Sequence, residues 1–109
     1  MKYFGSKEIH EARQHALDGG QALHENPLHT SQTLARHVPA CFERSARAAH
    51  LFDQDVARLI STARRLGVVR IFVDCRGGKS QHIDLCGKPL QRALLECCEL
   101  GSTNDPVKP

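Results

Sequence analysis

Residues 53–85 read DQDVARLISTARRLGVVRIFVDCRGGKSQHIDL, and this stretch decides the fold class because it predicts a helix followed by two strands. Asp53 is a good N-terminal cap and Gly67 suits the C-terminal cap of a helix. The side chains between them form one apolar stripe at helical spacing. The stripe consists of Val56, Leu59, Ile60, Ala63 and Leu66. Residues 53–67 are therefore predicted to form an amphipathic helix.

The second half of this stretch predicts a β-hairpin. Residues 68–74 are rich in β-branched side chains and almost continuously apolar, as expected for a central strand covered on both faces. Residues 76–79, Arg-Gly-Gly-Lys, tolerate the positive φ angles of a tight turn, so residues 80–85 are predicted to return as an antiparallel partner. Because side chains alternate along a strand, His82 and Asp84 are expected on the same face.

The flanking segments complete a small α/β (α+β) domain that is predicted to span residues 46–101. Pro89 suits the first turn of a helix that runs through Cys98 and ends at Gly101. Residues 46–52 can add a third strand, which gives a small antiparallel sheet of two or three strands packed with helices. Residues 102–109 have no apolar anchor and are predicted to be a disordered tail.

Residues 1–45 are predicted to form a helical N-terminal extension, part of which is mobile. One helix is expected at residues 6–18 and is terminated by Gly19-Gly20. A second is expected at residues 30–38 and is terminated by Pro39. An isolated hairpin is only marginally stable, so helices or a homodimer formed through the exposed strand edge must cover it.

The composition is that of a single soluble domain. Of the 109 residues, 40% are hydrophobic and 25% are charged, with a formal net charge of +3. The start of the chain has no apolar stretch that could serve as a signal peptide or a membrane span, which predicts a cytoplasmic protein with no membrane partner. The five cysteines include no Cys-x-x-Cys pair, which argues against a disulfide framework and a zinc ribbon and predicts reduced thiols.

The order and spacing of several short motifs resemble a known family. The motifs are His50-Leu51, Leu59, Ala63, Arg65-Leu66-Gly67, an apolar strand, His82-x-Asp84-Leu85 and Arg92-Ala93-Leu94. Over about residues 46–95 this pattern is similar to the bacterial domain-of-unknown-function family 4031. The resemblance implies a set of matching positions, His50, His82, Asp84 and Arg92, and implies no activity.

These four residues allow three interpretations. His50, His82 and Asp84 are the ligand types that bind zinc or another divalent metal ion. Alternatively, His82 and Asp84 are catalytic, with Asp84 fixing the tautomer of a histidine general base, while His50 and Arg92 bind an anionic ligand such as a nucleotide. In the third interpretation the role is structural: His82 and Asp84 cap the turn or pair with each other, and Arg92 bridges to Asp84 across the surface. The sequence does not choose among them, and whether the protein is an enzyme stays open.

A rival function is nucleic-acid binding or recognition of a protein partner through an arginine-rich helix face. The residues concerned are Arg58, Arg64, Arg65 and Arg70. They could contact phosphates, although the chain has no Trp and one Tyr, so a base-stacking platform is not evident. The other histidines lie in polar segments and are expected to be exposed. They are His10, His15, His24, His29 and His37.

Overall fold

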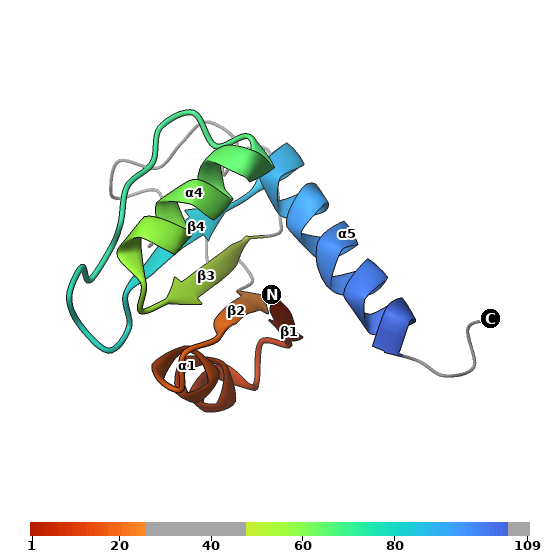
Figure 1. Cartoon of the computed structure of the whole chain (residues 1–109), viewed down its shortest axis with the longest axis horizontal. Coiled ribbons are helices and arrows are strands. Elements are labelled where there is room, and N and C mark those ends of the chain that lie inside the picture. Colours follow the sequence, from red (N-terminus) through yellow and green to blue (C-terminus); the bar gives the residue numbers. More distant parts are fainter. Residues whose placement is uncertain (26–47, 105–109) are drawn as a thin grey trace.

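The computed structural model describes residues 1–25 and 48–104, which form an α+β domain (Figure 1). The elements are β1 (Lys2–Phe4), α1 (Ile9–Leu17), β2 (Gln21–Glu25), β3 (Ala49–Asp53), α4 (Val56–Leu66), β4 (His82–Leu85) and α5 (Gly87–Asn104). The strands form one mixed sheet in the order β1-β2-β3-β4. The predicted fold class is therefore confirmed, with four strands in the described sheet where two or three were expected.

The additional strands come from the first 25 residues, of which only α1 is helical. β1 and β2 are parallel and are joined by α1, and β2 pairs with β3 in antiparallel fashion. These two strands are not predictable from the sequence, because strands of three and five residues are too short to show a clear alternation of polar and apolar side chains. The predicted helix at residues 30–38 and the predicted boundary between residues 45 and 46 lie outside the described residues.

The larger core lies between one face of the sheet and helices α4 and α5. Its members are Leu23, Ala49, Leu51, Leu59, Ala63, Leu66, Ile83, Leu85, Leu90 and Ala93. Burying a leucine or isoleucine side chain contributes about 1.5–3 kcal/mol to folding, so this layer provides most of the apolar stabilisation. The predicted third strand is confirmed as β3, whose Leu51 is fully buried in this core.

The opposite face of the sheet carries a smaller apolar cluster under α1. Its members are Phe4, Ala12, Ala16, Ala22 and Phe52. Farther toward β4, the same face carries histidine and aspartate side chains, because His50, His82 and Asp84 alternate with the leucines and isoleucine of the larger core. This polar part of the face is where a functional site can be built.

Helix α4 begins two residues later than the sequence predicts. Its N-terminal cap is Asp55, whose side chain accepts a hydrogen bond from the Arg58 backbone N–H at 3.1 Å. Asp53 instead ends β3, where it pairs with Gln21 of β2. The predicted C-terminal cap is confirmed, because Gly67 has a left-handed φ of 97°.

Replacing Gly67 with alanine is expected to lower the free energy of unfolding by about 1–2 kcal/mol, because an alanine at this φ is strained. The added Cβ would also lie 2.6 Å from the Arg92 Nη1 atom, which donates to the Leu66 carbonyl at 3.2 Å. Urea denaturation measures the loss. Gly77→Ala is a useful comparison, because its φ of 84° is also left-handed while no atom lies within 4 Å of the added Cβ. A smaller loss for Gly67 than for Gly77 would contradict a packing role for Arg92 at this cap.

The predicted central strand at residues 68–74 is wrong. Within this segment only Asp74 forms a β-bridge, to His82, and Val69 and Phe72 are 94% and 74% exposed. β4 pairs directly with β3, so the central positions of the sheet are taken by β2 and β3. The β-branched composition of the segment is a local preference that the tertiary arrangement overrides.

Helix α5 starts near Pro89, as predicted, and continues through Gly101 to Asn104. A glycine inside a helix costs only about 1 kcal/mol relative to alanine, so Gly101 does not stop it. Among the described residues, no helix is long and apolar enough to cross a membrane.

The described cysteines differ in their covalent state. Cys75, Cys97 and Cys98 are free thiols, whereas the buried Cys86 is disulfide-bonded. The expectation that all the cysteines are reduced is therefore wrong for Cys86. An odd number of cysteines argues against a complete framework but leaves room for a single bond.

Candidate metal site

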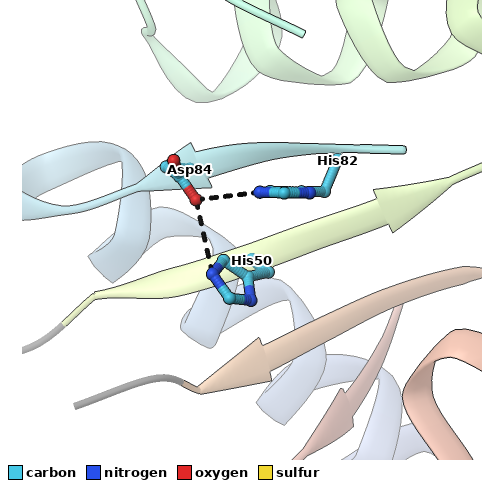
Figure 2. Close-up of side chains that lie close together, drawn as sticks. All are labelled: His50, His82 and Asp84. Atoms are coloured by element: carbon cyan, nitrogen blue, oxygen red, sulfur yellow. Dashed lines mark ion pairs between the residues drawn. The ribbon is translucent and has the colours of Figure 1, made fainter. Parts of the chain in front are cut away.

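Three of the predicted site residues meet on adjacent strands (Figure 2). His50 of β3 is the direct cross-strand partner of Asp84 of β4, and Phe52 is the partner of His82. The predicted placement of His82 and Asp84 on one face is confirmed, because the Asp84 carboxylate contacts the imidazole of His82 as well as that of His50.

The carboxylate of Asp84 lies between the two imidazoles. Its Oδ1 atom is 3.3 Å from His82 Nε2 and 3.5 Å from His50 Nε2. One ligand atom from each of the three residues lies within 4.8 Å of the others. Zinc binds nitrogen and oxygen ligands at about 2.0–2.1 Å in a tetrahedron, which places neighbouring ligand atoms about 3.3–3.4 Å apart. The two separations from Asp84 Oδ1 are already close to those around a bound ion.

The orientation of the His82 ring is fixed from outside the cluster. Its Nδ1 atom is 2.7 Å from the Ser80 carbonyl oxygen, which can only accept, so Nδ1 carries the proton. In the neutral imidazole, Nε2 then holds the lone pair, and it faces Asp84. A backbone carbonyl that orients a histidine in this way is the usual outer partner of a metal ligand.

Without an ion, His82 and Asp84 stabilise each other's charged forms. Burial is the largest single influence on His82 and lowers its pKa, but the hydrogen bonds to Asp84 and the Ser80 carbonyl and the charges of Asp84 and Asp74 together raise the pKa. Burial likewise raises the pKa of Asp84, but the hydrogen bond from His82 and the charges of His82 and His50 outweigh it, so this pKa is lowered.

His50 has the opposite tendency. Burial, followed by the positive charge of His82, lowers its pKa to about 4, although Asp84 opposes the shift. Near neutral pH the His50 imidazole is therefore uncharged, which is the form that binds metal ions.

The prediction that His24 is exposed is wrong. This histidine of β2 is 2% exposed, and its ring stacks on His50 with 5.7 Å between centroids. Its Nε2–H donates to the Ser6 carbonyl at 3.1 Å. His24 follows Ala22 by two residues, so on a strand the two side chains share a face, and Ala22 is the cross-strand partner of Phe52. This spacing is the only sequence signal for the position of His24.

The structure does not bring Arg92 into this cluster. Arg92 lies on α5, and its guanidinium donates to the Leu66 carbonyl at the C-terminal end of α4. Of the arginines considered for nucleic acids, Arg58 is bound to Asp53 and Arg65 pairs with Glu96 of α5. Two of these four side chains are thus engaged within the protein.

Comparison with known proteins gives no match: no family model matches the chain, and neither a curated protein nor a solved structure does. The resemblance to domain-of-unknown-function family 4031 stays a prediction. The function is therefore argued from the geometry of the site.

Proposed function

We propose that the protein binds a divalent transition-metal ion, with zinc as the reference ion, through His50, His82 and Asp84. The observation that carries this proposal is the separation of the ligand atoms: Asp84 Oδ1 lies 3.3 Å and 3.5 Å from the two imidazole nitrogens. Two imidazoles and one carboxylate form a ligand set that suits zinc and its first-row neighbours better than calcium or magnesium.

The charges at the site also suit a cation. In the absence of metal, the proton on His82 Nε2 neutralises Asp84, and a metal ion would replace that proton. Once that proton has left, the fixed Nδ1–H of His82 leaves its Nε2 lone pair for coordination, and the uncharged His50 imidazole supplies a second nitrogen ligand. Little rearrangement is required, because the β3–β4 pairing already holds all three side chains together.

Zinc is expected to raise the melting temperature of the chelator-treated protein, because an ion that binds only the folded state stabilises it by mass action. At a free zinc concentration of about 100 times the dissociation constant, the gain is about 2.7 kcal/mol. Differential scanning fluorimetry with and without zinc measures the shift.

His82→Ala should lose the zinc-dependent shift. His10→Ala should retain it, because His10 is an exposed histidine of α1 outside the cluster. A shift of equal size in both variants would contradict the assignment of the site, and the absence of any shift in the unaltered protein would contradict the proposed function.

A further inference from the structure

We infer that Asp74 is the fourth protein ligand of this metal ion, so that the site is closed by two imidazoles and two carboxylates. The inference rests on the proposed metal binding. Its basis is the position of Asp74, which pairs with His82 across a β-bridge. The Asp74 Oδ2 atom lies 3.8 Å from His82 Nε2.

The backbone holds Asp74 firmly against β4. The Asp74 N–H donates to the His82 carbonyl at 2.8 Å, and the His82 N–H donates to the Asp74 carbonyl at 3.1 Å. These reciprocal bonds fix the distance between the two Cα atoms, so the backbone of Asp74 is held at a constant position relative to His82. The fourth candidate is therefore attached to the same strand as two of the other ligands.

The side chain of Asp74 is also oriented. Its Oδ1 atom accepts a hydrogen bond from the Cys75 N–H at 3.1 Å, and this contact turns the other oxygen toward His82. The Oδ2 atom must approach His82 Nε2 by about 0.5 Å to reach the separation of neighbouring ligands around zinc. It must also turn toward Asp84 and His50, because the group whose ligand atoms all lie within 4.8 Å of one another consists of those two residues and His82. The side chain is 50% exposed, which leaves it room to make this movement.

A fourth protein ligand changes the character of the site. Zinc sites with four protein ligands are structural, whereas catalytic sites keep a position open for water. Two carboxylates also balance the charge of a divalent cation. With Asp74 included, the ion would link Asp74 to His82 and Asp84 of β4 and to His50 of β3. It would therefore hold the start of the loop at residues 75–81 against the sheet.

The test compares cobalt and zinc binding by the full chain and by Asp74→Asn, with Asp18→Asn as the matched control. Asp18 is an exposed aspartate that caps α1, so its replacement makes the same charge change away from the cluster. Cobalt(II) replaces zinc and reports its coordination by visible absorption. Isothermal titration calorimetry gives the zinc affinity at constant pH.

We expect Asp74→Asn to weaken zinc binding by at least about 10–100-fold, because removal of an outer partner of a ligand alone has an effect of that size. Azide is expected to alter the cobalt spectrum of Asp74→Asn, where a coordination position opens, and to leave those of Asp18→Asn and the unaltered protein unchanged. If the unaltered protein binds neither ion, the proposed function fails. If it binds zinc and Asp74→Asn binds with the same affinity, or if azide perturbs the cobalt spectrum of the unaltered protein, only the role of Asp74 is overturned.

Discussion

Replacing Asp53 with alanine is expected to lower the free energy of unfolding by about 3–5 kcal/mol, as the loss of one partner of a buried ion pair does. The Asp53 carboxylate is 0% exposed and accepts from Arg58 through both oxygens, at 2.7 Å each. It also accepts from the Gln21 side chain at 2.9 Å and from the Asp55 N–H at 2.9 Å. Because native domains are stable by only about 5–15 kcal/mol, a loss of this size removes a large fraction of the total.

The effect should lie at the lower end of this range. The Arg58 side chain is 44% exposed, so water can solvate it once Asp53 is gone. Arg58 also keeps its hydrogen bonds to the carbonyls of Gly19 and Gly20, at 3.0 Å and 3.1 Å. The Gln21 amide and the Asp55 N–H also lose their buried acceptor, although Gln21 keeps its hydrogen bond to Thr62 at 3.0 Å.

Asp55→Ala is the matched control for Asp53, because it removes a carboxylate from the same helix start. Loss of this N-terminal cap should cost only about 1 kcal/mol. Urea denaturation of both variants, in the presence of a chelator, measures the two losses. Equal losses would contradict the account in which the buried Asp53 network joins β2, β3 and α4.

Lowering the pH of the metal-free protein from about 6.5 to 4 is expected to cost about 3 kcal/mol through His50. The folded protein keeps the His50 pKa at about 4, whereas the unfolded chain has the ordinary value of 6.5. The unfolded state therefore binds the proton first as the pH falls, and stability is lost across this window.

His82 has its effect at higher pH. Because its folded-state pKa is raised, it contributes stability that is fully present below 6.5 and is lost as the pH rises through the folded value. Asp84, with a lowered pKa, contributes stability that is present above 3.8 and is lost as the pH falls through its folded value. The three groups together predict greatest stability near the pH at which free histidine titrates.

His50→Gln isolates the contribution of His50, because glutamine does not titrate. Urea denaturation at several pH values, with a chelator present, should show a shallower loss between pH 6.5 and 4 in the variant. Parallel stability curves for the two proteins would contradict the burial of a neutral His50.

The sequence predicts the elements whose periodicity and terminal residues all indicate the same structure. The apolar stripe, the acidic start and the terminal glycine specify α4 to within two residues. The convergence of His82 and Asp84 follows from strand alternation alone. A resemblance and ligand chemistry place His50 in the same candidate set as Asp84, but their pairing is not predicted, because no local rule sets the register between β3 and β4.

The other features depend on tertiary contacts. Residues 68–74 have strong β propensity, but the edge of the sheet offers them only the single bridge at Asp74. Asp53 looks like an exposed helix cap in the sequence, and its burial is explained only by Arg58 and Gln21. Asp74 carried no signal as a site residue, since its approach to His82 requires the bridge between them.

X-ray absorption at the zinc edge tests the metal site most directly, because the exposed Cys75 and Cys98 are competing zinc ligands in solution. If the proposed site binds the ion, the first shell consists of two imidazole nitrogens and carboxylate oxygens at about 2.0–2.1 Å, with no sulfur. A zinc–sulfur shell at about 2.3 Å, or a shell without imidazole, would contradict the proposed site.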